Sequence, residues 1–339
     1  MESFKRMLRQ YSNQLKNLVP IYIKDKKIEY KSIIYFDKSN KENNDEYNKV
    51  REYIICSIIN NDIHEDYYNY SRRWNNLRNQ VNSYIKLIYN NTIHKISCIH
   101  MAGRNNHYDF KILINDIEFN VEFKFNVTNV NDTPQFVSPM KPSQYLSMNF
   151  EEWYYENYLI QIADYGNLEI PNREVYLKKI HSNKVECMKH FKNKYDTNDN
   201  FKKYCKKIDK EAIQKFIQIT HINMEKLSDY LLEGQRNKIY MCYKDNEFYY
   251  DTLNENVYKI VKLDKKEPTN YIYSTETGIT LEIKLRFKNG CGLQFPAFQI
   301  KRKIPTIKEL KKICLNNGIP SPILKKDICL ILNKHNIVY

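Results

Sequence analysis

Residues 108–125 read YDFKILINDIEFNVEFKF, and this stretch decides the fold. Asn115 and Asp116 in its middle are residue types that favour a two-residue hairpin turn. With that turn, Ile114 faces Ile117, and every second pair farther from the turn joins two apolar residues. A half-buried antiparallel hairpin requires this pattern. The stretch therefore predicts a hairpin with one apolar and one polar face.

The polar face of this hairpin carries two carboxylates. The register places Asp109 opposite Glu122, and His107 opposite Lys124. Like charges at opposed positions destabilise a sheet, so a cation or a shared proton is expected between them. Carboxylate oxygens suit Mg²⁺ or Mn²⁺, and such an ion can activate water against a phosphodiester. Lys124 projects from the same face as Glu122, where its charge could orient that water or stabilise the transition state.

An acid on one strand followed by acid-x-Lys on the next resembles the PD-(D/E)XK nuclease superfamily, which has the restriction-endonuclease-like fold. Apolar residues at helical spacing predict a helix at about residues 67–89, and alternation predicts a strand over 95–101. With the strands 108–114 and 117–125, these give the helix-strand-strand-strand order of the family. The resemblance covers about residues 65–165.

The resemblance implies a Mg²⁺-dependent (or Mn²⁺-dependent) deoxyribonuclease. It assigns Asp109, Glu122 and the carbonyl of Phe123 as metal ligands, and Lys124 as a catalytic residue. Two departures stand out: His107-Tyr108 replaces the usual proline before the first acid, and the helix over 67–89 lacks the Glu that some members contribute. The full set of catalytic candidates adds a nearby His and a polar residue after the second strand: His107, Asp109, Glu122, Lys124 and Gln135.

Acid-x-Lys also occurs elsewhere, and the strongest rival is Glu282-Ile283-Lys284 on an alternating strand. A two-residue turn at Thr277-Gly278 would pair Glu282 with Tyr273, and a slip by one residue would pair it with Ile272. Neither register supplies a second acid. We therefore interpret this strand as a solvated or nucleic-acid-facing surface.

The composition favours an anionic partner. The 339 residues carry 54 Lys and Arg against 40 Asp and Glu, a formal net charge of +14. Asn, Ile, Lys and Tyr, whose codons are AT-rich, are overused, so codon bias explains part of the lysine excess. This bias suits a large DNA virus or an AT-rich eukaryote.

The sequence also indicates the cellular compartment in which we expect the protein. No apolar run approaches the roughly 18 residues of a membrane span, and the 8 Cys form no CxxC pair and follow no secretory signal. We expect a soluble intracellular protein, not secreted, in the cytoplasm (a viral factory if viral) or the nucleus, with no membrane partner.

The C-terminal stretch predicts two short helices. Thr306 can cap the first, Gly318 can end it, and a second apolar run begins near Leu324. The pattern resembles a SAP domain, a small helix-extended-helix module associated with DNA binding. A plain helical hairpin packed on the main body is the alternative.

The sequence therefore predicts an α+β protein with a mixed sheet flanked by helices and a small helical C-terminal module. The predicted regions are a helical and hairpin region (1–64), a nuclease-like core (65–170), a basic helical and strand-rich region (171–304) and a SAP-like module (305–339). DNA is the expected partner, and a homodimer stays open. The alternatives are a noncatalytic nucleic-acid-binding or packaging protein and, more weakly, a structural scaffold. The predicted nucleic-acid contacts are basic residues of the strand-rich region and the tail: Arg286, Lys288, Lys311, Lys325 and Lys326.

Overall fold

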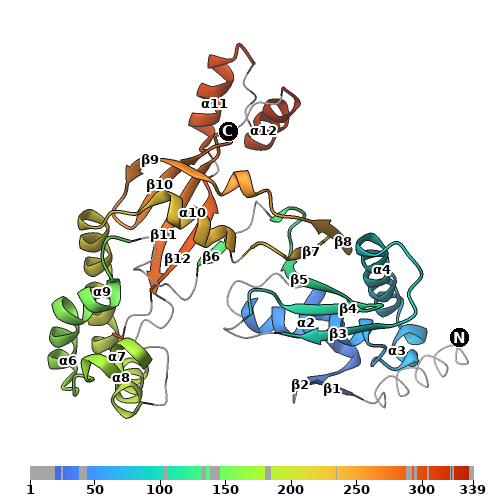
Figure 1. Cartoon of the computed structure of the whole chain (residues 1–339), viewed down its shortest axis with the longest axis horizontal. Coiled ribbons are helices and arrows are strands. Elements are labelled where there is room, and N and C mark those ends of the chain that lie inside the picture. The colour runs from blue at the N-terminus through green and yellow to red at the C-terminus, as the bar shows by residue number, and fades with distance from the viewer. Residues whose placement is uncertain are drawn as a thin grey trace, which may run out of the picture. The chain divides into compact units, whose positions relative to one another are not determined.

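The chain forms two compact units, one of residues 1–130 with 235–253 and one of 131–234 with 254–339. A computed structural model (Figure 1) describes residues 20–23, 26–37, 44–101, 106–130, 135–137, 146–179, 185–233, 235–287, 292–293, 296–303, 305–320, 322 and 324–335. We call the two units unit 1 and unit 2 and describe each by itself. Among the described residues, no helix is both long and apolar enough to cross a membrane.

Unit 1 is built on a five-stranded mixed sheet in the order β3-β4-β5-β7-β8. The first three strands form an antiparallel meander, β7 pairs with β5 in parallel, and β8 returns antiparallel to β7. Strand β5 is therefore central, with β4 on one side and β7 on the other. The strands are β3 (Ile96–His100), β4 (Phe110–Ile114), β5 (Ile117–Phe125), β7 (Ile239–Lys244) and β8 (Glu247–Asp251).

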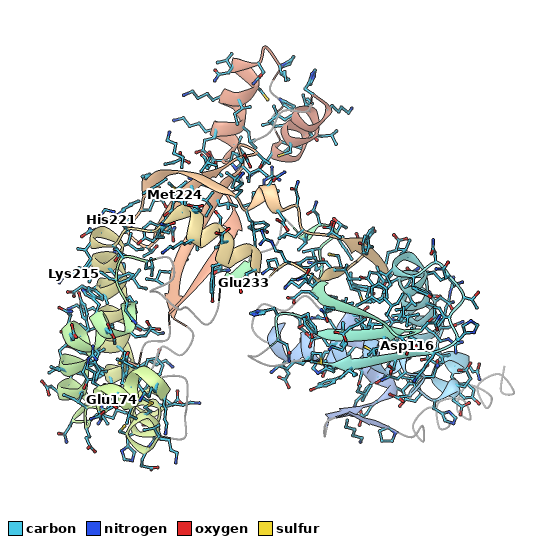
Figure 2. All side chains as sticks on the ribbon, in the orientation of Figure 1. Asp116, Glu174, Lys215, His221, Met224 and Glu233 are labelled. Atoms are coloured by element: carbon cyan, nitrogen blue, oxygen red, sulfur yellow. The ribbon has the colours of Figure 1, made fainter. Side chains whose placement is uncertain are left out.

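The turn between β4 and β5 has the predicted conformation. Asn115 and Asp116 both have positive φ, 47° and 71°, as a two-residue turn of this hand requires. The ladder pairs Ile114 with Ile117 and continues in the predicted register to Phe110 and Val121. Figure 2 marks the turn by its label on Asp116. The apolar alternation of both strands therefore fixed the register correctly.

Helices α2 (Asn44–Ile59) and α4 (Arg72–Ile88) pack on one face of this sheet. Helix α4 buries Trp74, Leu77, Val81 and Tyr84 against the apolar sides of the strands, in one hydrophobic core. The helix predicted over 67–89 is two helices, because Ser71 leaves helical geometry and caps α4 by accepting a hydrogen bond from the Trp74 N–H. The short helix before this break is α3 (Glu65–Tyr70).

The remaining described elements of unit 1 precede α2. A small hairpin of β1 (Ile21–Ile23) and β2 (Lys26–Ile28) leads into the 3-10 helix η1 (Tyr30–Phe36). The indole N–H of Trp74 donates to the carbonyl of Tyr30 at 2.7 Å, which ties η1 to α4.

Unit 2 contains a second five-stranded sheet and a group of helices. Its sheet has the order β6-β12-β11-β10-β9 and is antiparallel throughout. The strands are β6 (Gln135–Val137), β9 (Ile260–Lys266), β10 (Asn270–Thr275), β11 (Thr280–Phe287) and β12 (Pro296–Arg302). The helices, which follow β6 and precede β9 in the chain, are α5 (Phe150–Tyr154), the π-helical turn η4 (Tyr155–Leu159), α6 (Ile160–Gly166), α7 (Arg173–Lys179), α8 (Glu186–Thr197), α9 (Asp199–Ile219) and α10 (Met224–Glu233). The turn η5 (Glu255–Val257) precedes β9.

The tail of unit 2 is a pair of short helices with a core of its own. Helix α11 (Ile307–Asn316) begins at a capping box in which Thr306 and Glu309 bond to each other's backbone. Gly318, with φ of 66°, follows its end. Helix α12 (Lys325–Lys334) packs on α11 around four buried residues: Leu310, Cys314, Ile328 and Leu332. The predicted helix pair is present, and its resemblance to a SAP domain stays a prediction.

The structure confirms the predicted class, α+β with a mixed sheet flanked by helices. Its two units do not follow the four predicted ranges, because residues 235–253 supply β7 and β8 to the sheet of unit 1.

Candidate active site

Asp109 directly precedes β4 and is fixed by three hydrogen bonds. Its N–H donates to the Val121 carbonyl at 3.0 Å, and its carbonyl accepts from the Met101 N–H at 2.8 Å. Its carboxylate Oδ2 accepts from the Phe123 N–H at 2.9 Å. The side chain therefore binds the backbone of β5, and β4 begins at Phe110 rather than at the predicted Tyr108.

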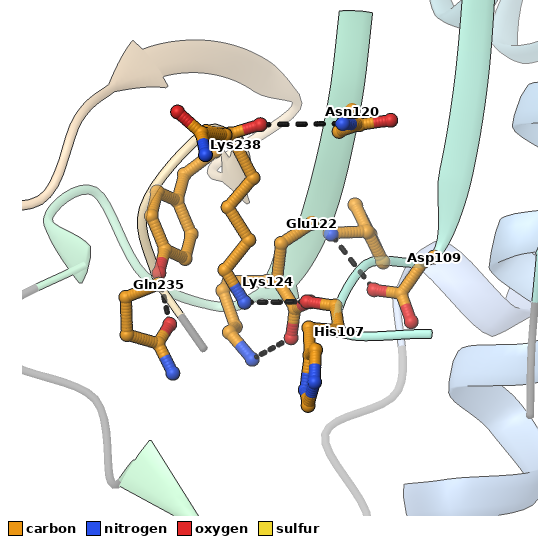
Figure 3. A network of polar contacts seen from close by, with 10 residues as sticks. His107, Asp109, Asn120, Glu122, Lys124, Gln235 and Lys238 are labelled. Carbon is orange, nitrogen blue, oxygen red and sulfur yellow. Dashed lines mark hydrogen bonds and ion pairs between the residues drawn. The ribbon is translucent and has the colours of Figure 1, made fainter. Parts of the chain in front are cut away.

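Glu122 lies on the polar face of β5 between two ammonium groups (Figure 3). Its Oε1 is 2.6 Å from Lys124 Nζ, and its Oε2 is 3.4 Å from Lys238 Nζ. The three side chains are largely withdrawn from solvent, with 17% of Glu122, 24% of Lys124 and 5% of Lys238 exposed. Lys124 takes the position predicted from the acid-x-Lys spacing, beside Glu122.

The two carboxylates differ in their electrostatics. Burial raises the pKa of Asp109 well above its ordinary value, and the negative charges of Glu122 and Glu52 raise it further. Burial also acts to raise the pKa of Glu122, but Lys124 and Lys238 outweigh it, so the pKa is lowered. Glu122 is therefore a stable anion, whereas the positive charge of Lys124 does not offset the burial of Asp109.

Both lysines face the same carboxylate, but their pKa values move in opposite directions. Burial acts to lower the pKa of Lys124, yet the carboxylates of Glu122 and Asp109 prevail and raise it. Burial lowers the pKa of Lys238, and the neighbouring ammonium of Lys124 lowers it further against the attraction of Glu122. Lys124 is therefore firmly held as a cation at neutral pH.

Lys238 is a site residue that the sequence did not reveal. It lies just before β7, which pairs with β5 in parallel, so a segment more than a hundred residues away reaches Glu122. Its Nζ also donates to the His107 carbonyl at 2.5 Å. Lys238 thereby joins Glu122 to the segment that leads into Asp109. Only the pairing of β5 with β7 could have identified it.

A third carboxylate, Glu52, reaches this region from α2. Its Oε2 is 2.9 Å from Nε2 of the buried His100 on β3, and the ring of Tyr53 lies 4.4 Å from the His100 ring, centroid to centroid. The charge of Glu52 contributes to the raised pKa of Asp109. The helix predicted over 67–89 contains no Glu, and the helix-borne carboxylate whose charge acts on Asp109 belongs to α2.

The oxygen donors present fit a hard divalent cation. Asp109 and Glu122 supply carboxylates. Phe123, whose N–H binds Asp109, stands between Glu122 and Lys124 in β5. The described part of the chain contains no group of three or more His, Cys, Asp or Glu side chains placed to hold a metal. One or two carboxylates are enough for Mg²⁺, which keeps several of its waters.

The other two predicted catalytic residues are His107 and Gln135. The His107 side chain is exposed, and only its backbone carbonyl joins the network. Gln135 belongs to unit 2, where its backbone in β6 pairs with Ile300 of β12. The rival Glu282 pairs with Ile272, the slipped register, and its carboxylate is bound by Lys301 at 3.0 Å and by Asn270.

The predicted nucleic-acid contacts are distributed over unit 2. Arg286 lies in β11, with its backbone paired to Ala297, and Lys288 lies outside the described residues. In the tail, Lys311 is exposed on α11, Lys325 is half-buried at the start of α12, and Lys326 follows it.

Comparisons of this chain with protein-family models, with curated proteins and with solved structures find no match.

Proposed function

We propose that this protein is a metal-dependent nuclease that hydrolyses phosphodiester bonds of nucleic acid, with DNA as the favoured substrate. The observation that carries the proposal is the Asp109–Glu122–Lys124 cluster on one hairpin. The hydrogen bond from the Phe123 N–H to Asp109 and the ion pair of Glu122 with Lys124 place all three side chains at one end of β4 and β5.

The sequential order of elements around the cluster also supports the proposal. Helix α4 is followed by β3, β4 and β5, which is the order that the resemblance to PD-(D/E)XK nucleases implies. Glu122 lies on β5, and Asp109 directly precedes β4, the strand paired with it. The net charge of +14 suits a polyanionic substrate.

The residues divide the chemistry among them. Asp109 and Glu122 would hold Mg²⁺, with the Phe123 carbonyl as a third donor, and a Mg²⁺ ion so bound supplies an activated water and neutralises charge on the phosphate. Lys124 keeps its proton, because its pKa is raised, and therefore acts as a cationic hydrogen-bond donor to the reacting phosphate or water rather than as a base. Lys238 orients Glu122 and holds the His107 segment in place.

The experiment that tests this proposal measures cleavage of labelled single-stranded, duplex and branched DNA, and of RNA, in Mg²⁺, Mn²⁺ or EDTA. Wild type is compared with Asp109→Ala, Glu122→Ala and Lys124→Ala. Glu118→Gln is the matched control, because Glu118 lies on β5, is exposed and pairs with Lys111 at 2.7 Å. We expect metal-dependent cleavage that the three variants lose and the control keeps.

Binding of the same substrates is recorded alongside cleavage. Salt-sensitive binding without cleavage by wild type, unchanged in the three variants, would refute the nuclease proposal. That result would favour the alternative of a noncatalytic nucleic-acid-binding protein.

A further inference from the structure

Helix α9 of unit 2 carries lysines along its exposed side that no predicted site includes. Phe201, Cys205, Ile208, Ala212 and Phe216 bury the other side of the helix, which packs against α6 and α8. The exposed side carries four lysines at successive helical positions: Lys203, Lys206, Lys207 and Lys210. At 100° per residue these four fall within an arc of about 100°, over a length of about 10 Å. We call this set the lysine stripe.

In the described part of the chain, the lysine stripe has no acidic partners, whereas several other lysines of unit 2 do. Lys178, Lys189, Lys215 and Lys259 each lie within 4 Å of a Glu carboxylate. Among the described residues, no ion pair is found for any of the four stripe lysines. On α9 itself, Glu211 pairs with Lys215 at 3.0 Å, and Asp209 is buried.

Lysine overuse alone does not explain this arrangement. The stripe places like charges three and four residues apart, at Lys203 with Lys206 and Lys207, and at Lys210 with the same two. Such pairs destabilise an isolated helix, whereas a polyanion bound along the stripe would remove the repulsion.

We propose that the lysine stripe binds the sugar-phosphate backbone of nucleic acid. The proposal deepens the proposed function, and it rests on that function only for the choice of nucleic acid among polyanions. A membrane surface is disfavoured, because a helix that binds at a lipid interface exposes large apolar side chains beside its basic residues. Between Lys203 and Lys210, Cys205 and Ile208 are buried, and the half-buried Tyr204 stacks on Tyr165.

The residues on either side of the lysine stripe define its width. Lys202 lies over the ring of Tyr195 at 5.4 Å, and Tyr204 stacks on Tyr165 of α6 with ring centroids 3.9 Å apart. The charges of Asp164 and Glu211 act on Tyr204, so negative charge lies on that side. Figure 2 shows α9 with Lys215 labelled, which is five residues beyond Lys210, the last stripe residue. A bound strand would therefore follow the four lysines along the helix axis.

The test measures DNA binding in EDTA, where cleavage does not interfere. The full chain carrying Lys203→Gln, Lys206→Gln, Lys207→Gln and Lys210→Gln is compared with wild type by fluorescence anisotropy on labelled single-stranded and duplex DNA. Glutamine keeps the helix propensity and removes the charge, and circular dichroism checks the fold. The matched control removes four exposed lysines of unit 1, as Gln: Lys27, Lys31, Lys86 and Lys95.

The stripe variant is expected to bind DNA at least about 30-fold more weakly than wild type near 0.1 M salt. The steepness of log K against log salt is expected to fall by about 3, since each lost phosphate contact lowers this slope by about 0.7 to 0.9. The control is expected to stay within about threefold of wild type. Equal losses in both variants, or none in the stripe variant, would overturn the proposal. Loss of binding to anionic vesicles or to an acidic peptide, with DNA binding kept, would overturn it too. If wild type binds DNA through the stripe but cleaves no substrate, only the nuclease proposal is refuted.

Discussion

Replacement of Asp109 by Asn should stabilise the metal-free protein while it removes the proposed activity. Asn keeps an oxygen that can accept the Phe123 N–H, and it removes a charge that burial, Glu122 and Glu52 all disfavour. A raised pKa in the folded state means that the stability contributed by the protonated carboxyl is complete below its ordinary value of 3.8 and is lost as the pH rises through the folded value. The gain from Asn should therefore be absent near pH 4 and grow as the pH rises.

The expected gain in the free energy of unfolding can be converted into a shift in melting temperature from the size of unit 1. A single stabilising substitution commonly yields about 0.5–2 kcal/mol, and we expect about 1–2 kcal/mol here. Unit 1 comprises residues 1–130 and 235–253. For a domain of that size, such a gain corresponds to a rise in melting temperature of about 2–8 °C.

The assay is thermal unfolding in EDTA and in excess Mg²⁺ at pH 5 and pH 8. Asp62→Asn is the control, because Asp62 is an exposed carboxylate of the same unit. Wild type should gain stability from Mg²⁺, whereas Asp109→Asn should be more stable in EDTA and should not respond to Mg²⁺. A destabilised variant, an equal gain in Asp62→Asn, or a full Mg²⁺ response in Asp109→Asn would refute the reasoning.

Two further changes test other parts of the structure. Lys238→Met should destabilise unit 1 by about 1–3 kcal/mol in chemical denaturation, because Glu122 keeps one cation instead of two and the His107 carbonyl loses its donor. The control Lys244→Met, at the other end of β7, should destabilise unit 1 less. Equal destabilisation by the two substitutions would contradict the role of Lys238. Burial raises the pKa of Asp209 on α9 from 3.8 to about 8, so its stabilising neutral form is lost as the pH rises from about 4 to about 8. The free energy of unfolding of Asp209→Asn should therefore rise relative to wild type by up to about 4 kcal/mol between pH 5 and pH 8, at about 1.4 kcal/mol per pH unit. Denaturation curves that show the same difference between the two proteins at both pH values would contradict this.

The hairpin and its register were predictable from the sequence because both depend on local signals. The Asn115-Asp116 turn fixes which residues face each other, and the apolar alternation confirms the choice. The capping residues of the tail are equally local, and Thr306 and Gly318 act where the sequence placed them.

The rest of the candidate site depends on contacts between distant segments. Lys238 reaches Glu122 because β7 pairs with β5 in parallel, and a parallel pair has no turn that would reveal it in the sequence. Glu52 faces His100 because α2 packs on β3, and the spacing of residues within α2 does not show which face meets that strand. Long-range pairing also explains why residues 235–253 belong to unit 1.

The most direct test of the proposed function is single-turnover cleavage of one DNA substrate by Lys124→Met in saturating Mg²⁺, beside wild type and Glu118→Gln. Lys124 contacts Glu122 and is not a proposed metal ligand, so its loss should spare DNA binding and act on the rate. A nuclease that uses this cluster should cleave in wild type and the control and lose at least about 100-fold in rate in Lys124→Met, the scale of one lost transition-state donor. Equal rates in all three proteins, or no metal-dependent cleavage by wild type of any substrate it binds, would contradict a nuclease site at Asp109, Glu122 and Lys124.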